Sequence, residues 1–292
     1  MDLELARTFL AVYETGNFNR AAEHLHVTQS TVSSRIQNLE DQLGQKLFQR
    51  SRAGTEPTAA GLRFHHHATS LVRVWMHARQ ELVLPEPLEE VLTVGGQFTL
   101  WDQLLSAWLP WMRRNLPAVA IRAEFGFPDI LMQRLVEGTL DIGVMYAPQN
   151  RSGFMIDKLL DDRLIAVGSD PHTGGPGNSD YVFVDWGPEF RADHAQAFPS
   201  APLPAVSVSH GLLALSYMLS CGGSAYLPHR SVRTQLKAGR LHRLPELPSF
   251  QRTAYVVYPV DYGSDVRFAR ALDGLHHVAR QGARGSRRKV GS

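Results

Sequence analysis

The sequence predicts a multidomain chain, with an all-α domain at the N-terminus, one long connecting helix, and an α/β body of two lobes. Three observations predict this fold class. Apolar residues recur at helical spacing through residues 3–43. A heptad-like apolar pattern then runs through residues 58–84. Beyond a Pro-rich break at residues 84–87, short apolar strands alternate with helical segments, which is typical of parallel sheets with helical crossovers.

The composition is that of an ordinary soluble protein of two or three domains. Of 292 residues, 43% are hydrophobic and 20% are charged, and no apolar run approaches the ~20 residues that span a bilayer. The start of the chain, MDLELARTF, lacks the basic segment and apolar core of a signal peptide. We therefore expect a cytoplasmic protein with no membrane partner. Cys221 is the single cysteine, so an internal disulfide is excluded and a buried small residue is its expected role.

Three short helices are expected in the first 45 residues. The first covers about residues 3–15 and ends at Gly16, and the second covers about residues 19–25. A turn at residues 26–27 separates the second helix from a third, at about residues 29–43. Thr28 supplies the N-cap of this third helix. One apolar stripe along the third helix predicts its buried face: Val32, Ile36, Leu39 and Leu43.

The opposite face of the third helix carries hydroxyl, amide and guanidinium groups. Such groups hydrogen-bond base edges and phosphates in the major groove of DNA. A short helix and a tight turn in front are the arrangement that presents a helix to that groove. A solvated amphipathic helix is the alternative for this segment taken alone. The candidate DNA-binding residues of this helix are Thr28, Gln29, Ser30, Ser33, Ser34 and Arg35.

A short strand at residues 46–48 and a basic turn at residues 50–54 follow the third helix. A loop of this kind beside a recognition helix reaches the DNA backbone or the minor groove, which adds Arg50 and Arg52 to the candidates. A solvated loop is the alternative. Residues 1–60 carry six Lys or Arg against seven Asp or Glu, so the domain is not basic. DNA binding must therefore depend on where single charges lie.

The stretch AAEHLHVTQSTVSSRIQNLEDQLGQKLFQR, followed by TAAG, resembles the winged helix-turn-helix of LysR-type transcriptional regulators. The resemblance covers about the first 65 residues densely. It implies a winged helix-turn-helix domain over residues 1–60, and it places the family's recognition residues at Gln29, Ser30, Ser33, Ser34 and Arg35. It also implies an effector domain that resembles the two-lobe periplasmic binding proteins of type 2. Pro57 departs from the usual Leu of the family, and we expect a stiffer exit from the wing rather than lost binding.

A linker and dimerisation helix is expected over residues 58–84. Its apolar residues recur at alternating spacings of four and three, a heptad seam that predicts pairing with the same helix of a second subunit. Packing on the chain's own body is the alternative. Consecutive histidines at residues 65–67 point about 100° apart, so they cannot share an ion and no metal site is expected. The seam consists of Phe64, Ala68, Leu71, Trp75, Ala78 and Leu82.

The C-terminal body is expected to form two lobes with a cleft between them. The first lobe takes residues 88–163 and the returning segment 265–292, and the second takes residues 164–264. Expected strands include residues 91–94, 119–125, 141–146, 164–167, 181–186, 206–209 and 254–259. The segments TLWDQLLSAWL and YVFVDWGPEF are similar to the flagellar-regulator subgroup of the LysR family.

Ligands of open α/β sheets bind beyond the carboxyl ends of the strands. Thr99 and Ser209 lie near helix N-termini, where free backbone N–H groups favour an anion. The family resemblance implies effector contacts at Thr99 with its neighbours and in the loop after residues 206–209. The aromatic residues favour an apolar or aromatic ligand, and simple packing between the lobes is the alternative. The candidate effector-binding residues are Gln97, Phe98, Thr99, Phe127, Tyr146, Trp186, Ser209 and His210.

The sequence thus predicts a DNA-binding transcription regulator that responds to a small-molecule effector in the cleft between the lobes. It is expected to bind double-stranded DNA as a homodimer or as a homotetramer, a dimer of dimers, with RNA polymerase as a further partner. No cofactor beyond a small-molecule co-inducer is expected. The alternatives are a solute-binding protein and an effector-independent regulator with a vestigial cleft. The sequence holds no P-loop and no GxSxG, so an enzyme is not expected.

Overall fold

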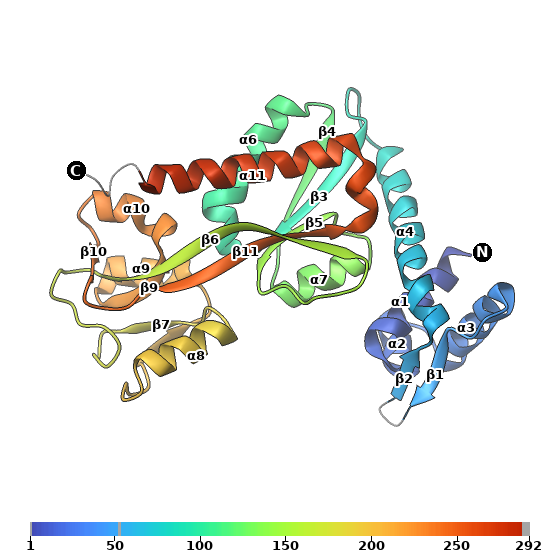
Figure 1. Cartoon of the computed structure of the whole chain (residues 1–292), viewed down its shortest axis with the longest axis horizontal. Helices are drawn as coiled ribbons and strands as arrows, with labels where there is room; N and C mark the ends of the chain where they lie inside the picture. The colour runs from blue at the N-terminus through green and yellow to red at the C-terminus, as the bar shows by residue number, and fades with distance from the viewer. Residues whose placement is uncertain (1, 52–53, 288–292) are drawn as a thin grey trace.

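A computed structural model describes residues 2–51 and 54–287. The N-terminal domain lies at one end of the molecule, the α/β body lies at the other, and the long helix α4 joins them (Figure 1). None of the helices within these residues is long and apolar enough to cross a membrane. The fold class expected from the sequence is confirmed, as the following elements show.

Three helices and a β-hairpin make up the N-terminal domain. Gly16 and Gly44 end the first and third helices with positive φ angles of 60° and 64°, which glycine adopts without strain. The side chains of Asp2, Asn17 and Thr28 cap the three helix N-termini by accepting backbone N–H groups. Residues 50–51, expected in a turn, continue a strand instead. The elements are α1 (Leu3–Thr15), α2 (Phe18–Leu25), α3 (Gln29–Leu43), β1 (Phe48–Ser51) and β2 (Gly54–Pro57).

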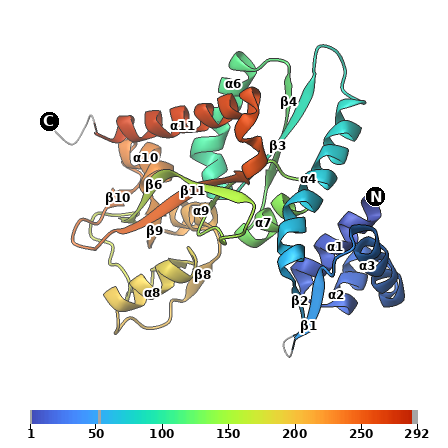
Figure 2. The ribbon, with the colours of Figure 1, turned by 45° about the vertical axis from the view of Figure 1, so that its right-hand side comes forward.

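Helix α4 (Ala59–Glu81) begins at the Thr58 cap and leaves the domain as a single 23-residue helix. Its first half packs on α1, with Ala68 and Val72 inside the N-terminal core. Its second half runs beside the first lobe of the body, which both views of the chain show (Figures 1 and 2). The predicted long helix is therefore present, and it touches both parts of the chain.

One seven-stranded sheet extends through the body in the order β10-β6-β11-β5-β3-β4, with β9 paired to β6. In lobe I, three parallel strands lie among helices that precede or follow them, as the β-α-β-α-β pattern predicts. Apolar residues of these strands and helices form the core of lobe I. The lobe I elements are β3 (Glu90–Gly96), α5 (Phe98–Leu100), α6 (Ser106–Asn115), β4 (Val119–Phe125), α7 (Pro128–Val136), β5 (Ile142–Tyr146) and α11 (Val266–Arg287), with a π-helical turn at Trp101–Leu105 and a 3₁₀ turn at Val260–Ser264.

Lobe II has its own apolar core. Its helices and short strands lie between the two long strands β6 and β11 in the sequence. These two strands pass through both lobes, and β11 pairs antiparallel with β6 along the whole length of β11. The lobe II elements are β7 (Val182–Val184), α8 (Pro188–Ala197), β8 (Val206–Val208), α9 (Gly211–Cys221), β9 (Ser224–Pro228), α10 (His229–Lys237) and β10 (His242–Arg243). The connecting strands are β6 (Phe154–Gly168) and β11 (Phe250–Pro259).

In the body, one expected strand is present but longer than expected, and the expectation for Cys221 was wrong. The strand expected at residues 164–167 is the last part of the 15-residue β6, because the charged first half of β6 has no continuous apolar pattern that predicts a strand. Cys221 is exposed rather than buried. It occupies the last turn of α9, beyond the buried residues Ala214 and Met218. The expected lobe boundary between residues 163 and 164 falls inside β6, and the division into lobes stays a proposal.

Candidate DNA-binding surface and effector pocket

The N-terminal half of α3 presents a polar face to solvent. The Thr28 hydroxyl accepts the Thr31 N–H at 3.2 Å and lies 2.9 Å from the Ser30 hydroxyl, so it is committed to the helix start. Gln29, Ser33 and Ser34 are exposed. Val32, Ile36 and Leu39 of the predicted stripe are buried and fix α3 on the domain core, whereas Leu43 at its end is 40% exposed, contrary to expectation. The polar side chains therefore face outward from a rigid support.

A groove of about 570 Å³ separates α3 from the β-hairpin. Gln29, Ser33 and Gln37 line one wall at helical spacings of four, and Gln49 and Thr55 of the hairpin line the other. The walls thus offer amide and hydroxyl groups, which both donate and accept hydrogen bonds.

Glu40 fixes the hairpin to α3 from below. Its carboxylate is buried, and it accepts the backbone N–H groups of Leu47 at 2.8 Å and Phe48 at 3.3 Å. The Lys46 ammonium lies 2.6 Å from the same carboxylate, and that hydrogen bond raises the pKa of Lys46. Sequence reasoning missed Glu40, because a single acid on a polar helix resembles any solvated residue.

Arg35 does not extend freely toward solvent. Its guanidinium lies 3.3 Å from the Glu4 carboxylate and 3.4 Å from the Thr8 hydroxyl, both on α1. A role for Arg35 on DNA therefore requires it to leave these partners. The predicted Arg52 lies outside the described residues, and so does the side chain of Arg50.

The predicted dimerisation seam divides into two parts. Phe64 and Ala68 pack against the chain's own N-terminal core, where Ala68 has no exposed surface. Further along α4, Leu71 is 40% exposed, Trp75 50% and Leu82 86%, and Ala78 is half-buried between them. Only this second part is left to meet another subunit.

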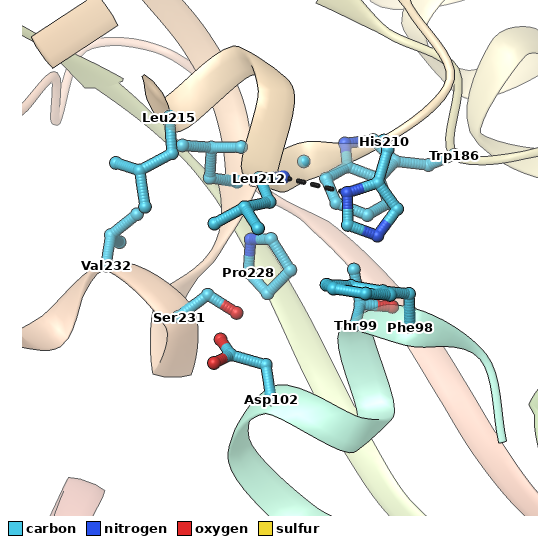
Figure 3. A pocket seen from close by; sticks show the side chains of 12 residues that line it. Phe98, Thr99, Asp102, Trp186, His210, Leu212, Leu215, Pro228, Ser231 and Val232 are labelled. Atoms are coloured by element: carbon cyan, nitrogen blue, oxygen red, sulfur yellow. Dashed lines mark hydrogen bonds between the residues drawn. The ribbon is translucent and has the colours of Figure 1, made fainter. Parts of the chain in front are cut away.

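A small pocket lies between the lobes, at the carboxyl ends of β3 and β9 (Figure 3). The free space in it is about 20 Å³, which is room for one or two water molecules. Lobe I supplies Phe98, Thr99 and Asp102, and the remaining lining residues come from lobe II. Those lobe II residues include Trp186, His210, Leu212, Leu215, Leu227, Pro228, Ser231 and Val232.

His210 and Phe98 meet across the two lobes. The Nδ1 atom of His210 accepts the Leu212 N–H at 3.1 Å, so the neutral ring carries its proton on Nε2. Burial lowers the pKa of His210, which the charge of Asp102 partly offsets. The imidazole stands edge-on to the Phe98 ring, with 4.4 Å between centroids and 84° between planes (Figure 3). This polar–aromatic contact closes one side of the pocket.

The structure brings four of the eight predicted effector residues to the pocket: Phe98, Thr99, Trp186 and His210. Gln97 and Tyr146 are turned to structural bonds instead. The Gln97 side-chain oxygen accepts the Tyr146 N–H at 2.6 Å, and the Tyr146 hydroxyl donates to Asp162 at 2.8 Å. Phe127 and Ser209 are exposed and do not line the pocket.

Sequence reasoning missed three polar groups near the pocket. Asp102 follows Thr99 by one helical turn, and Ser231 lies in the first turn of α10 after strand β9. Both residues could have been predicted by including the first helical turn after each strand, since ligands bind beyond the carboxyl ends of strands. Arg252 on β11 stacks on the Tyr146 ring at 3.8 Å and on the Trp186 ring at 5.3 Å. Nothing local in the sequence marks it, because the three residues are far apart in the chain.

Residues 3–62 match the model of the bacterial regulatory helix-turn-helix protein of the lysR family, and residues 85–279 match the LysR substrate binding domain. The second match alone covers more than half of the chain. The chain belongs to the LysR family of bacterial transcriptional regulators. It is therefore a LysR-type transcriptional regulator with an effector-binding domain, as the sequence predicts.

The chain is similar to the HTH-type transcriptional regulator HdfR of Escherichia coli O17:K52:H18 (strain UMN026 / ExPEC). The two are 31% identical over 261 residues, which is 88% of this chain and 92% of HdfR. A second HdfR, from Escherichia coli O7:K1 (strain IAI39 / ExPEC), matches with the same identity and coverage. The expected family and the expected likeness to the HdfR subgroup are both confirmed.

Solved structures of LysR-type proteins share the fold. Full-length LysG from Corynebacterium glutamicum with bound effector Arg superposes with a TM-score of 0.59 at 19% identity, over 96% of this chain and 99% of LysG. ArgP from Mycobacterium tuberculosis gives a TM-score of 0.58 at 21% identity, over 96% of this chain and 97% of ArgP. At these identities the likeness establishes the fold alone.

Proposed function

We propose that this regulator reads DNA with the exposed face of α3, through Gln29, Ser30, Ser33 and Ser34, while Arg50 and Arg52 of the wing contact the backbone. The observation that supports this is the rigid presentation of those polar side chains beside the groove that faces the hairpin. Thr28 supports the helix start rather than contacting bases. Arg35 binds DNA only if its guanidinium leaves the Glu4 carboxylate and pairs with a phosphate instead.

Binding to the DNA upstream of its own gene tests this proposal. Gln29→Ala removes an amide that pairs with one base, so the expected loss of affinity is about 1–3 kcal/mol. Gln42→Ala changes another exposed glutamine of the same helix that does not line the groove, so it serves as the matched control and leaves affinity unchanged. If the protein shows no salt-sensitive binding to that DNA, or if both variants behave alike, α3 is not the reading helix.

We infer that a small effector binds between the lobes, at the pocket lined by Phe98, Thr99, Trp186 and His210. Support comes from the position of the pocket at strand carboxyl ends and from its lining by both lobes. LysG, which has the same fold, was solved with bound effector Arg. Because the present space holds only one or two waters, a ligand has to bind a more open arrangement, and its differential affinity shifts the lobes toward that arrangement.

A thermal-shift screen of small metabolites tests effector binding, since a ligand of the native state raises the melting temperature. A hit whose shift disappears in Trp186→Ala supports the pocket between the lobes. The closed pocket also favours a second candidate, an effector-independent regulator with a vestigial cleft. A screen without hits, together with DNA affinity that no metabolite changes, supports this second candidate.

We further propose that the protein works in the cytoplasm as a homodimer or a dimer of dimers, paired through Leu71, Trp75, Ala78 and Leu82. Two subunits present two recognition helices, which suits a DNA site of two half-sites. RNA polymerase is a proposed additional partner. We propose no catalytic activity and no cofactor other than the effector, since domains of a family of transcriptional regulators match residues 3–62 and 85–279.

A further inference from the structure

A buried carboxylate joins the linker helix α4 to lobe I. Asp141, just before β5, is 1% exposed. One of its oxygens accepts the Tyr262 hydroxyl at 2.7 Å and lies 2.9 Å from Nε2 of His77 on α4. Its other oxygen accepts the backbone N–H of Thr93 on β3 at 2.7 Å. Each carboxylate oxygen has a donor within lobe I, and the oxygen that accepts the Tyr262 hydroxyl gains His77 of α4 as a further partner when the helix is docked.

A second carboxylate contacts α4 over the three turns that precede His77. Asp261 lies 3.2 Å from the Arg73 guanidinium and 3.3 Å from the His66 ring, and the Ser70 hydroxyl donates to it. The same guanidinium lies 4.6 Å above the Tyr262 ring, so the two contacts are linked. Three successive turns of α4 are therefore tied to lobe I by polar groups.

The backbones of α4 and lobe I also approach closely at Gly138. This glycine follows α7 with a φ of +69°, and a Cβ placed on it would lie 3.2 Å from the Arg73 backbone nitrogen and Cα. A side chain there would require the helix to move back by a few tenths of an ångström. Glycine suits this close approach because it has no Cβ. This backbone contact is independent of the charged groups, and it also indicates that the helix packs directly on lobe I.

We propose that His77, Asp141 and Tyr262 form a joint that holds α4 on lobe I, and that His77 and Asp141 are positioning residues for DNA binding. With the joint formed, the DNA-binding domain and lobe I move as one rigid unit. The spacing of two recognition helices in a dimer then follows the orientation of lobe I. The positioning role rests on the DNA binding proposed above, whereas the joint itself does not.

The joint depends on pH through His77. Burial lowers the pKa of His77, but the hydrogen bond and the charge of Asp141 together outweigh it, and the pKa is raised above its usual value. The groups that face His77 are Asp141, Tyr262 and Glu90 from lobe I, and Arg73 and Glu81 from its own helix. A raised pKa means that the folded joint is stabilised by protonation. The joint is accordingly strongest below the usual histidine pKa and weakens as pH rises through the raised one.

Distance measurements by pulsed electron paramagnetic resonance test the joint without any ligand or DNA. Spin labels at Asn38→Cys on α3 and Arg114→Cys on α6, both exposed positions, report the domain arrangement in a Cys221→Ser background. Labelled protein is diluted with unlabelled protein so that only distances within one chain are seen. We expect one narrow distribution, which broadens in His77→Leu and in Gly138→Ala.

Two matched controls keep the test specific. His67→Leu changes an exposed histidine of the same helix outside the joint. Gly239→Ala places a Cβ at a φ of +66° with nothing within 4 Å, so it carries the same backbone strain as Gly138→Ala without the contact. Both controls keep the narrow distribution. His77→Gln still donates a hydrogen bond to Asp141, so this variant keeps the narrow distribution. Because glutamine does not titrate, the width of the distribution no longer depends on pH between 6 and 9.

The positioning role is measured as affinity for the DNA upstream of the gene. His77→Leu and Gly138→Ala are expected to lose roughly tenfold or more, within the usual range of coupling between sites. If both variants keep the narrow distribution, the joint does not hold α4 and the inference is wrong. If the distribution broadens while affinity is unchanged, the positioning role is refuted. If even the unaltered protein binds no DNA, the proposed function fails, and the distances still decide the joint.

Discussion

Replacing Trp75 by alanine should weaken subunit pairing. Trp75 is the largest side chain of the exposed part of the seam on α4, and half of its surface is open to solvent in the isolated chain. Leu71 and Leu82 lie one and two turns away on the same face of the helix. A second copy of α4 laid along this face would cover the indole in both subunits.

The size of the effect follows from the exposed area. A tryptophan side chain buries up to about 250 Å², so half of it leaves about 125 Å² per subunit and about 250 Å² in a dimer. At about 25 cal/mol per Å² the upper limit is about 6 kcal/mol. Association costs and partial replacement by the alanine methyl reduce the net loss, and buried aromatic anchors typically give about 2–4 kcal/mol. We expect the dimer Kd to rise by roughly 30-fold to 1000-fold.

Sedimentation velocity over a range of concentrations measures this Kd directly. Leu62→Ala is the matched control, because Leu62 is 52% exposed on the same helix and points about 140° away from Trp75 at 100° per residue. The control should dimerise like the unaltered protein. If Trp75→Ala dimerises with an unchanged Kd, or if Leu62→Ala weakens it equally, the seam on α4 does not pair the subunits.

Three further changes test the structure of the N-terminal domain. Glu40→Gln removes the charge that holds Lys46 and the hairpin, and it should lower the free energy of unfolding by about 1–3 kcal/mol in thermal melts, whereas Asp41→Asn on the exposed side should not. His65 is buried and stacked on Tyr13, and burial, with smaller effects of Arg151 and His66, lowers its pKa to about 4. The unfolded chain therefore binds the proton more readily than the folded chain. The free energy of unfolding should fall by about 2 kcal/mol between pH 7 and pH 5 in urea titrations. His65→Phe should reduce this fall, and an equal fall in both proteins would contradict the assignment. Gly61→Ala places a Cβ against the carbonyl of Leu47 and should cost about 1–3 kcal/mol as an overpacked contact; a variant as stable as the parent would show that the contact relaxes freely.

The helices of the N-terminal domain could be predicted because each one carries its own signals. Caps at Asn17 and Thr28 and glycines at positions 16 and 44 mark their ends, and the stripe from Val32 to Leu39 marks the buried face. The long strands β6 and β11 could not be predicted in full. Their central residues lie between two lobes, where one face is polar, so the apolar pattern is interrupted.

Half of the effector site could be predicted for a similar reason. The ends of strands are visible in the sequence, and Phe98, Thr99 and His210 follow such ends. Which way a side chain turns is not visible: the Gln97 side chain accepts the Tyr146 backbone N–H, and the Tyr146 hydroxyl donates to Asp162. Polar groups that meet from distant segments, such as Glu40 with Leu47 or His77 with Asp141, depend on tertiary contacts that no periodicity encodes.

The pocket and the joint are connected by the same two strands. Phe98 follows the carboxyl end of β3, and the N–H of Thr93, in the middle of β3, donates to Asp141. From Thr93 to Gly96, the last residue of β3, the strand spans about 10 Å at 3.3 Å per residue. Asp141 likewise precedes β5, whose last residue, Tyr146, bonds Gln97 beside the pocket. Both strands are buried in the core of lobe I and pair with each other, so they do not stretch or slide. With the proposed effector site and joint, an effector that moves lobe II against Phe98 would turn lobe I as a body, and the joint at His77 would pass that turn to α4 and to α3.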